Sequence, residues 1–583
     1  MRSIFFVCFI FCTRILFAQD QDSTSSTADQ VDYKHNLSEV VVTGQLKEIS
    51  IDKSIYSVKV IEQKKLNSGI YNDLGSLLEK SLNINLSQDN VLGSSISMQG
   101  VSGRNVKVLV DEVPVIGRLA GNIDLSQISL LNIERIEIVE GPMSTIYGSD
   151  ALAGTINIVT KNAFNHKYLL NTYYESIGKY NLDVQVNRKI KFNQFSYQFG
   201  RKYFNGWSEG QKFTLLPISQ LADTNRVKQW KPKEQYFNRF THSFNMNKTD
   251  IRSYIELFNE KLTNLGTPLA PYYEAAFDEF YKTTRINVGS DAKYKNKTDE
   301  IRLLMSYNNY MRSKETIYKD LADLSQVIVN SPSAQDTSVF DAILTKIVYS
   351  NYKIPNWKYQ FGVDIQFHTA KGERILDNYQ QQSNFASFLT IENQLNNIIS
   401  LRQSNRIIYN SDYSAPFIHS GNVLFNFNNY QIRTSYGKGF RAPDFKELYL
   451  NFVDVNHNII GNENLIAETS MHYNFNNTIK GDIYGVDFSV NFGAFYNKIA
   501  NKINLYEDPD FTGRYSYFNI DKFTSKGVNT NIKLSYYKTE LIIGSSHIGT
   551  LSEIRGADNY SGYWLFNTNY NISSFIEITK NSR

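Results

Sequence analysis

The side chains best suited to catalysis are two carboxylates three residues apart, Glu137 and Glu140, in and beside the strand-like run 133–139. Paired carboxylates can act as a general acid and a general base. In a strand of a small domain such residues more often form salt bridges, and we favour that interpretation. The run 437–442 reads GKGFRA, at most half of a dinucleotide fingerprint. The sequence contains no phosphate loop, metal-protease helix or nucleophile elbow, so we predict that the protein is not an enzyme.

Thiols and imidazoles give no catalytic or metal-binding pattern. The chain has two cysteines, Cys8 and Cys12, and eight histidines without the spacing of metal ligands. Both cysteines lie in residues 1–18, which combine Arg2, an apolar run and Ala18 before a polar stretch, as in a secretory signal peptide. We expect this segment to be removed on export. The mature chain would then have no thiols, which excludes disulfides, thiolate metal sites and cysteine nucleophiles.

The elements that position the carboxylates form a small mixed domain over residues 51–162. Apolar runs of strand length cover residues 106–110, 133–139 and 155–159. Tight turns are expected at five glycines: Gly100, Gly103, Gly141, Gly148 and Gly154. Helical spacing of Leu74, Leu77 and Leu78 predicts a short amphipathic helix that packs on the sheet.

From about residue 163 onward the pattern changes to strict alternation. Tyr359, Phe361 and Val363 alternate with polar or small neighbours, and residues 486–492 repeat the pattern. Aromatic residues make up 14% of the chain, with 39 Tyr and 37 Phe. No apolar run after the N-terminus approaches the ~18 residues that a membrane helix needs. Because a closed barrel satisfies its backbone hydrogen bonds within a bilayer, the alternation favours a membrane barrel over residues 163–583.

The residue-by-residue sequence of the glycine-rich region is more specific than its pattern of apolar runs and glycines. It reads ISMQGVSGRNVKVLVDEVPV from Ile96 and IERIEIVEGPMSTIYGSDALAGTINIVTK from Ile133. This resembles the plug domain of TonB-dependent outer-membrane receptors. The residues in register with the phrase that marks this domain are Glu134, Arg135, Glu137, Gly141, Pro142, Ser144, Tyr147, Gly148, Ala151, Gly154, Ile156, Asn157, Ile158 and Thr160. GKGFRAPDFKELY at 437–449 and IIGNENLIAETS at 459–470 resemble two phrases of the family's later barrel.

The resemblance implies a membrane all-β barrel of about 22 strands with an N-terminal α+β plug domain inside its lumen. The expected order is a signal peptide (1–18), a mobile periplasmic segment (19–50), the plug (51–162) and the barrel (163–583). Few residues follow Ser470, and the last residues lack a terminal aromatic. We therefore expect the barrel to be C-terminally incomplete by roughly four strands.

A β-prone island, LSEVVVTGQ, interrupts the polar segment 19–50. Its central residues are Glu39, Val40, Val41, Val42 and Thr43. The resemblance favours a TonB box, a peptide that the periplasmic protein TonB captures by strand addition. The alternative is simply the first strand of the plug. TonB, with its inner-membrane energising complex, is thus the expected protein partner.

The resemblance also implies that charged plug residues pair with the barrel wall and hold the plug in place. Glu134, Arg135 and Glu137 match those positions. Two positions depart from the family's pattern, because Gln99 stands where Arg is usual and Glu112 where Gly is usual. Gln99 is expected to weaken the ionic lock. Since a buried unpaired charge is costly, a barrel partner is expected to have changed as well.

The expected function is active uptake of an iron complex, a siderophore or haem, across the outer membrane of a Gram-negative bacterium. His457 lies where haem receptors of the family carry a haem-binding histidine, and neutral imidazole is a good ligand for haem iron. An ordinary polar loop histidine is the alternative. Arg441, Tyr272 and Tyr273 could instead contact an anionic ferric siderophore.

Other partners and functions follow from charge and family. The net charge of +4 is near neutral for 583 residues and does not indicate nucleic acid. We expect a monomeric barrel in outer-membrane lipid, without a resident cofactor, since haem or a ferric siderophore would be cargo. Cobalamin or another nutrient is the alternative cargo. A passive channel and a non-transporting surface receptor are the alternative functions.

Overall fold

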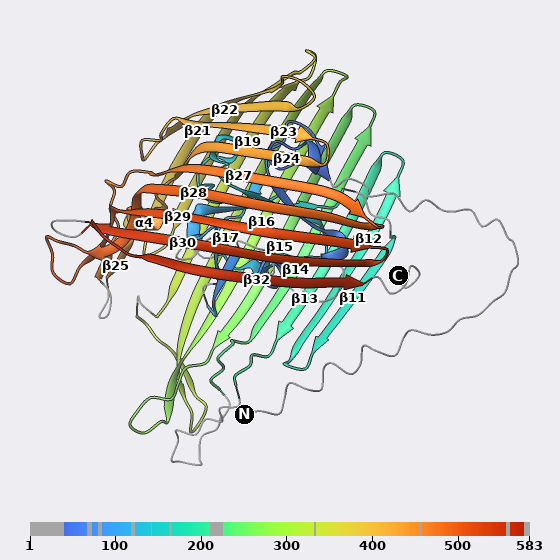
Figure 1. Ribbon diagram of the computed structural model, residues 1–583. Coiled ribbons are helices and arrows are strands. Elements are labelled where there is room, and N and C mark those ends of the chain that lie inside the picture. Colours follow the sequence, from blue (N-terminus) through green and yellow to red (C-terminus); the bar gives the residue numbers. More distant parts are fainter. Residues whose placement is uncertain are drawn as a thin grey trace, which may run out of the picture. The chain divides into compact units, whose positions relative to one another are not determined.

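Figure 1 shows the chain as a computed structural model. The structure describes residues 40–66, 73–79, 84–91, 93–117, 123–141, 143–162, 166–209, 226–331, 334–453, 458–555 and 560–576. The expected signal peptide, Glu39 and His457 lie outside these residues.

The plug is built on a five-stranded sheet in the order β3-β9-β10-β7-β8. At its centre β10 (Gly154–Thr160) runs antiparallel to β9 (Ile133–Glu140) and parallel to β7 (Val106–Val110). All seven residues of β10 are buried, which is why its sequence lacks the alternation of a half-exposed strand. The outer strands are β3 (Val58–Glu62) and β8 (Val113–Pro114).

Shorter elements complete the plug. A three-stranded sheet contains β4 (Ile84–Asp89), β5 (Gly93–Met98) and β6 (Val101–Ser102), and β1 (Val40–Val41) pairs with β2 (Ile49–Ser50). Gln99 and Gly100 turn the chain between β5 and β6 with φ of +53° and +80°, a left-handed conformation that glycine adopts without strain. The helices are α1 (Gln63–Leu66), α2 (Leu74–Leu78), α3 (Ser144–Tyr147) and the 3₁₀ turns η1 (Ile51–Lys53), η2 (Gly103–Asn105) and η3 (Leu125–Gln127).

The predicted amphipathic helix is confirmed as α2. Asp73 caps it by accepting a hydrogen bond from the Ser76 backbone N–H at 2.8 Å. Leu74, Leu77 and Leu78 are buried against the sheet. They join a core cluster that includes Ile84, Ile96, Val108, Leu125, Ile136, Ile138, Ile156 and Ile158.

A further sheet of 22 strands surrounds the plug, and almost all of its neighbouring pairs are antiparallel. Four of its strands have two or three residues and the others have 8 to 22. The long strands are β11 (Tyr168–Glu175), β12 (Lys179–Ile190), β13 (Asn193–Phe204), β14 (Lys233–Met246), β15 (Thr249–Asn264), β16 (Ala275–Lys295), β17 (Asp299–Asp320), β19 (Asp336–Asn351), β20 (Trp357–Lys371), β21 (Tyr379–Gln394), β22 (Ile399–Asn410), β23 (Ile418–Phe427), β24 (Tyr430–Arg441), β27 (Glu468–Ile483), β28 (Val486–Glu507), β29 (Tyr515–Tyr536), β30 (Thr539–Arg555) and β32 (Trp564–Ile576). The short ones are β18 (Gln326–Ile328), β25 (Asn451–Val453), β26 (Asn458–Ile460) and β31 (Tyr560–Ser561), and two further helical turns are η4 (Leu376–Asn378) and α4 (Phe445–Tyr449).

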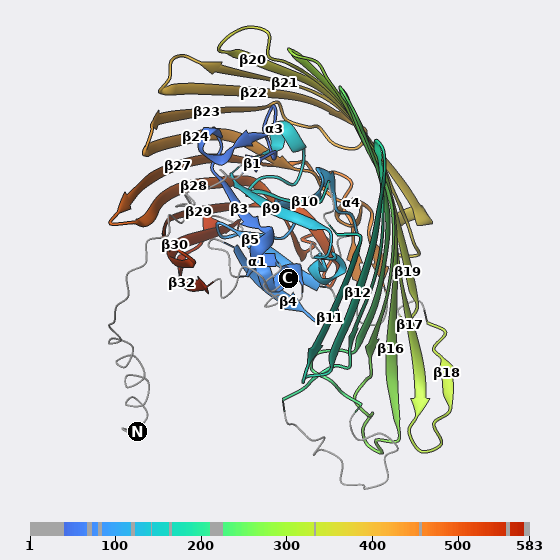
Figure 2. The same cartoon turned by 90° about the vertical axis from the view of Figure 1, so that its right-hand side faces the viewer.

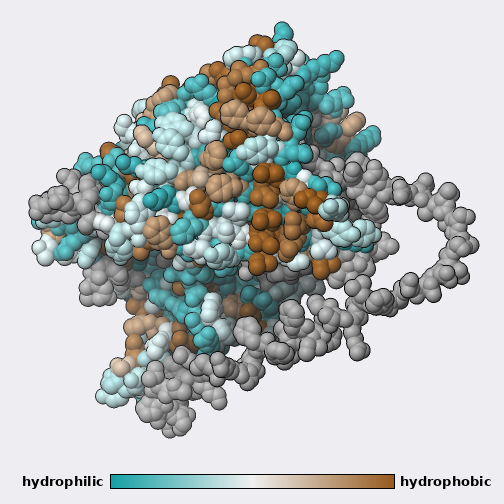
Figure 3. All heavy atoms as spheres, in the orientation of Figure 1, coloured by the Kyte–Doolittle hydropathy of each residue, from teal (hydrophilic) through white to brown (hydrophobic). Residues whose placement is uncertain are grey.

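The sheet has an apolar outer face and a polar inner face, as the alternating sequence predicts. Figure 2 shows the strands curving around the plug, and Figure 3 shows apolar side chains gathered over the outer face. On β20, Trp357, Phe361 and Phe367 are exposed on the outside, whereas Asp364 is buried on the inside. No helix in the described part of the chain is both long and apolar enough to cross a bilayer.

The predicted fold class, a membrane all-β barrel with an α+β plug in its lumen, is confirmed. Within the described ranges, β11 pairs only with β12, and no pairing between β11 and β32 is found. The expected shortage of closing strands stays a prediction.

Candidate functional site

The carboxylate of Glu137 in β9 is the acceptor for the backbone of the N-terminal segment. It is fully buried and accepts hydrogen bonds from the backbone N–H groups of Val42 at 2.9 Å and Thr43 at 2.7 Å. Arg135 donates to the same carboxylate at 2.7 Å. Glu137 therefore fixes two consecutive peptide units of the segment against the plug.

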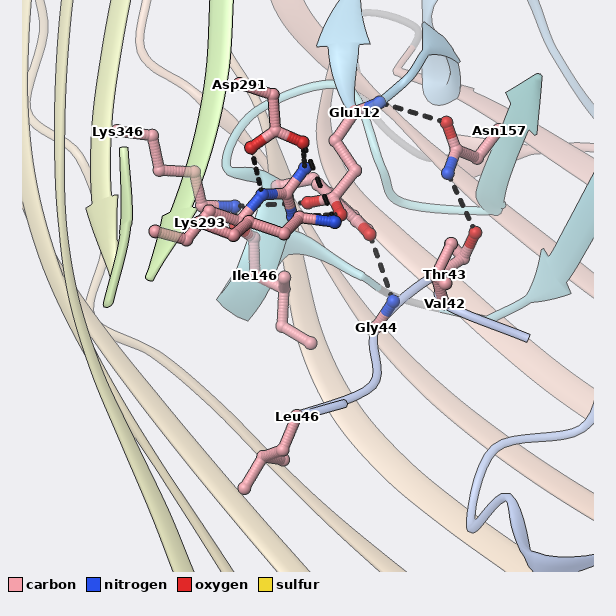
Figure 4. A network of polar contacts seen from close by, with 12 residues as sticks. Val42, Thr43, Gly44, Leu46, Glu112, Ile146, Asn157, Asp291, Lys293 and Lys346 are labelled. Carbon is pink, nitrogen blue, oxygen red and sulfur yellow. Dashed lines mark hydrogen bonds and ion pairs between the residues drawn. The ribbon is translucent and has the colours of Figure 1, made fainter. Parts of the chain in front are cut away.

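Asn157 in β10 connects this segment to the turn after β7. Its amide oxygen accepts from the Glu112 backbone N–H at 3.1 Å, and its amide nitrogen donates to the Thr43 hydroxyl at 3.0 Å (Figure 4). Asn157 lies opposite Glu137 in the sheet, so both side chains contact the N-terminal segment from the same side of the sheet.

Tyr147, at the end of α3, holds the next residue. Its hydroxyl oxygen accepts from the Gly44 backbone N–H at 3.0 Å. Burial raises the pKa of Tyr147 well above its usual value, and the nearby Glu112 carboxylate raises it further. The phenol therefore stays neutral, as an acceptor beside carboxylates should.

The barrel wall grips the same segment from its other side. Arg402 in β22 donates to the Gly44 carbonyl at 2.7 Å, and its guanidinium lies 5.1 Å from the centre of the Tyr56 ring. Tyr352 donates to the Leu46 carbonyl at 2.7 Å. Residues 42–46 are thus clamped between plug and wall, with Arg402 itself buried.

A second set of contacts joins the turn after β7 to strands β16, β17 and β19. Glu112 accepts from Arg302 at 2.6 Å and lies 3.9 Å from the Lys346 ammonium. Arg302 also binds Asp291 at 2.8 Å (Figure 4). The preceding residue, Asp111, lies 3.5 Å from Arg252 in β15.

A third contact region lies at η3. Asp124 binds Lys233 in β14 at 2.7 Å, and Gln127 donates to Glu260 in β15 at 3.0 Å. Burial raises the pKa of Asp124, but the Lys233 ammonium and hydrogen bonds from Lys233 and Ser126 outweigh it and hold the pKa below its usual value. The plug is therefore anchored by buried charges along β14–β19.

The remaining described candidates are Arg441, Tyr272 and Tyr273. Arg441, at the end of β24, is buried and binds Glu447 at 2.8 Å and Glu468 at 2.6 Å, so its guanidinium is occupied by internal partners. Tyr272 is 73% exposed in the loop between β15 and β16 and is open to solution. Tyr273 beside it adopts a left-handed backbone conformation.

The site has the chemistry of polar binding. No group of three or more histidine, cysteine or acidic residues that could hold a metal ion is found in the part of the chain that the structure describes. The arrangement is a plug tied by ion pairs into a polar-lined barrel, with a clamped N-terminal segment.

Two family descriptions match the chain in this order. The TonB-dependent Receptor Plug Domain matches residues 50–155, and the TonB dependent receptor-like beta-barrel matches residues 147–579. The chain belongs to the TonB-dependent receptors. Members of this family are receptors and transporters of the outer membrane, so the chain is not an enzyme, as predicted.

Several relatives of this TonB-dependent receptor are known. The Vitamin B12 transporter BtuB of Vibrio cholerae serotype O1 is 24% identical over 474 residues, covering 79% of this chain and 71% of that protein. The siderophore receptor PirA from Pseudomonas aeruginosa has a TM-score of 0.63 at 16% identity, covering 90% of this chain and 94% of that one. The ferric yersiniabactin uptake receptor FyuA from Yersinia pestis has a TM-score of 0.67 at 12% identity, covering 89% and 83%. At these identities the two structures support the fold alone.

The predicted contacts of Glu134, Arg135 and Glu137 with the barrel need correction. Arg135 binds Glu134 at 2.6 Å and Glu137 at 2.7 Å, and Glu137 binds the N-terminal segment, so these partners lie in the plug and in the segment before it. The reason is that β9 lies between β3 and β10, where the N-terminal segment covers it. The ion pairs to the barrel come instead from Asp52, Arg104, Asp111, Glu112 and Asp124.

The two departures from the family's pattern have opposite outcomes. The Gln99 amide is buried, and its one described hydrogen bond, 3.5 Å long, is to Glu140 in the plug. Glu112 forms an ion pair with Arg302 of the wall. Local sequence could not reveal its partner, because Arg302 is 190 residues away. The expectation of a changed barrel partner opposite Gln99 stays a prediction.

The TonB-box assignment stays a prediction. Of its described residues, Val40 is 42% exposed, whereas Val41 and Thr43 are buried. β1 and β2 pair as a short antiparallel ribbon that presents Val40.

Proposed function

We propose that the protein is an active transporter that imports a bulky, scarce nutrient across the outer membrane at the expense of TonB-transmitted work. The cargo is an iron complex, a siderophore or haem, and the segment 39–43 is the part that TonB grips. The observation that carries the proposal is the clamp on residues 42–46 between Glu137 of the plug and Arg402 of the wall. A pull on this segment acts on both domains at once.

The clamp favours active transport over a passive channel. The plug lies within the barrel and is tied to it by buried ion pairs, so it blocks the lumen until some of these contacts break. Such contacts make spontaneous opening of the lumen rare, so that opening requires externally supplied work. Tyr272, open to solution, is available to a cargo arriving from outside, and the haem variant of the proposal rests on His457.

Cobalamin is the second candidate cargo. It is favoured by the resemblance in sequence to the Vitamin B12 transporter BtuB, which spans 79% of this chain. The cargo is therefore sought among iron complexes and corrinoids together.

Growth on single nutrient sources tests the proposal. A strain without the gene should fail to grow on limiting ferric siderophore, haem or cobalamin as the one source, and the full-length gene should restore growth. A gene lacking codons 39–43 should not restore it although the protein reaches the membrane. Restored growth from that deletion would indicate a passive channel, and His457→Ala should impair growth on haem alone if haem is the cargo.

A further inference from the structure

Three lysines gather on the outer face of β24, β28 and β29: Lys438, Lys498 and Lys526. Lys438 and Lys498 lie on either side of Met471, each directly opposite it in the sheet. Lys526 lies opposite Tyr496, which is two positions before Lys498 and on the same face. These strands lie in front of the plug in Figure 1, so the face that carries the lysines is turned toward the reader.

The outward orientation of the three side chains follows from the alternation of the strands. Asn497 and Ser525, which precede Lys498 and Lys526, are fully buried on the inner face. Because successive residues of a strand point to opposite faces, the two lysines point outward, and both are exposed. Lys438 is half-buried and shares the face of Met471, which is 50% exposed.

The three ammonium groups have no counter-charge among the described residues. None of them forms an ion pair with a described carboxylate, although the Lys526 ammonium lies 4.1 Å from the centre of the Trp564 ring. Glu553, an acidic residue of the neighbouring strand β30, lies opposite Lys522 and not opposite any of the three. A patch with three positive charges is therefore left on this part of the outer face.

Basic side chains on the outer face of β13–β20 are instead paired with carboxylates. The pairs are Arg201–Glu234, Lys282–Glu315 and Lys371–Asp341, with the closest atoms 2.6, 3.8 and 3.9 Å apart. Exposed pairs of this kind contribute little to stability, but they balance the local charge. The charge is thus balanced at these positions and unbalanced on β24–β29.

The patch lies at the level where lipid headgroups are expected. Beside it, Tyr436, Tyr473 and Tyr496 form a cross-strand row, with the rings of Tyr436 and Tyr473 5.0 Å apart. Toward the clamped end of the barrel the row is followed by exposed apolar side chains such as Phe475 and Phe492. Aromatic rows mark the membrane–water interface of barrels. The lysines lie about one membrane-spanning length, ~9–11 residues, from the short turns at the clamped end.

We propose that Lys438, Lys498 and Lys526 form a binding site for a lipid of the outer leaflet whose headgroup carries two phosphate groups. Ammonium groups donate charge-assisted hydrogen bonds to phosphate, and each lysine near a membrane surface adds to the binding of anionic lipid. Since neighbouring strands are ~4.8 Å apart, the patch spans about 10 Å and can contact two phosphates at once. The tyrosine row and the apolar side chains beyond it lie where the acyl chains of such a lipid run. The site is independent of the cargo and of TonB.

Lipid binding to the purified full-length receptor in neutral detergent tests the proposal. The probes are bisphosphorylated lipid A, monophosphorylated lipid A and phosphatidylethanolamine, and native mass spectrometry measures the bound lipid over a titration. We expect the bisphosphorylated lipid to bind at least about tenfold more tightly than phosphatidylethanolamine, with the monophosphorylated lipid between them. Equal binding of the three lipids overturns the proposal. Complete displacement of the bisphosphorylated lipid by millimolar inorganic pyrophosphate also overturns it, because the site would then recognise phosphate without the lipid.

Substitution of the lysines assigns the binding to the patch. The triple variant Lys438→Gln, Lys498→Gln and Lys526→Gln should bind the bisphosphorylated lipid at least about thirtyfold more weakly, since each lysine contributes about fivefold. Replacement of all three with Arg should keep the affinity within about threefold. The melting temperature should stay the same in both variants, because the substituted side chains lie on the outer face. Unchanged affinity in the triple Gln variant overturns the proposal.

A control variant removes as many positive charges from the other part of the outer face. It carries Arg201→Gln, Lys282→Gln and Lys371→Gln, and it should keep the affinity within about threefold, because these charges are more than a screening length away at physiological salt. Weakening equal to that of the triple Gln variant of the patch would show that net charge governs lipid binding, and it would overturn the assigned site.

Discussion

The plug faces two different walls. Along β14–β19 it is held by charges: Glu112 binds Arg302, Asp124 binds Lys233, and Asp111 approaches Arg252. Along β27–β29 the wall instead presents His472, Asn497 and Ser525, in adjacent cross-strand positions. These three side chains are fully buried, and among the described residues their nitrogen and oxygen atoms have no direct hydrogen-bond partner.

The plug meets these three wall residues with backbone and small residues, and its ion pair with β27, between Asp52 and Lys480, is partly exposed and therefore contributes little. A Cβ atom placed on Gly141 would lie 3.2 Å from the His472 ring, and one on Gly100 would lie 3.7 Å from the Ser525 Cβ. Separating the plug from the three wall residues therefore breaks no direct polar contact of theirs. Separation along β14–β19 must expose or part buried ion pairs, which is costly. The difference leads us to expect that the plug leaves the β27–β30 side first and pivots on β14–β19.

A covalent tether on each side gives the largest expected effect. Gly100→Cys with Ser525→Cys, combined with Thr550→Ala to make room, should form a disulfide, since Cβ atoms 3.7 Å apart suit one. Oxidation should then abolish uptake of the cargo almost completely, and a reductant should restore it.

The matched tether lies on the charged side. Ser126→Cys and Gln235→Cys, whose native side chains are 3.0 Å apart, are joined by a short thiol-reactive linker. Uptake should remain at more than about half, because the pivot is not required to open. An equal loss of uptake with both tethers would contradict the expectation that the plug leaves the β27–β30 side first.

Removing one charge on the anchored side should loosen the whole plug. Arg302→Ala leaves Glu112 and Asp291 without their shared partner, at a cost of about 3 kcal/mol. The urea concentration at which the plug becomes protease-sensitive should fall accordingly. Lys282→Ala is the control, because its 3.8 Å pair with Glu315 is exposed and contributes less than about 1 kcal/mol. A similar shift in both variants would remove the special role of Arg302.

Arg402→Gln should release the N-terminal segment without loosening the plug. Loss of a charged hydrogen bond to the Gly44 carbonyl costs about 2 kcal/mol. Maleimide should then modify a Val41→Cys thiol about tenfold to thirtyfold faster, since Val41 is buried in the clamped form. Arg201→Gln, which disrupts a partly exposed pair with Glu234, should leave that rate unchanged. An unaltered rate in Arg402→Gln would mean that the plug alone holds the segment.

The smallest expected effect is on how the stability of the plug depends on pH. The pKa of Asp124 is lower in the folded protein than its unfolded value of about 3.9. The stabilisation is therefore fully present above pH ~4 and is lost as the pH falls through the folded pKa. Protease sensitivity of the plug, measured from pH 6 down to pH 3, should rise less steeply in Asp124→Asn than in the wild type. Parallel pH profiles would show that other carboxylates govern acid release.

The sequence allowed the plug, the barrel and the helix α2 to be predicted, because each has a local signal. The runs that became β7, β9 and β10 were readable from apolar residues between glycines, and the barrel from its alternation. The wall partners of Asp111, Glu112 and Asp124 were not readable, because they are set by tertiary packing across more than a hundred residues. A contact of Glu137 with the barrel is expected because this residue matches a position at which related receptors pair the plug with the wall. In the fold Glu137 meets peptide N–H groups 94 and 95 residues away.

The carboxylate of Glu137 has a consequence for whatever protein captures the N-terminal segment. Strand addition requires backbone N–H groups, and those of Val42 and Thr43 are already bound at 2.9 Å and 2.7 Å. A periplasmic strand that pairs through these N–H groups must replace the Glu137 carboxylate as their acceptor. Capture therefore exchanges one acceptor for another, with little net gain in hydrogen bonds. The difference in hydrogen-bond strength between the Glu137 carboxylate and the acceptors of the incoming strand then sets the affinity of the partner for the segment. Glu137 would be left facing Arg135, ready to rebind the segment when the partner departs.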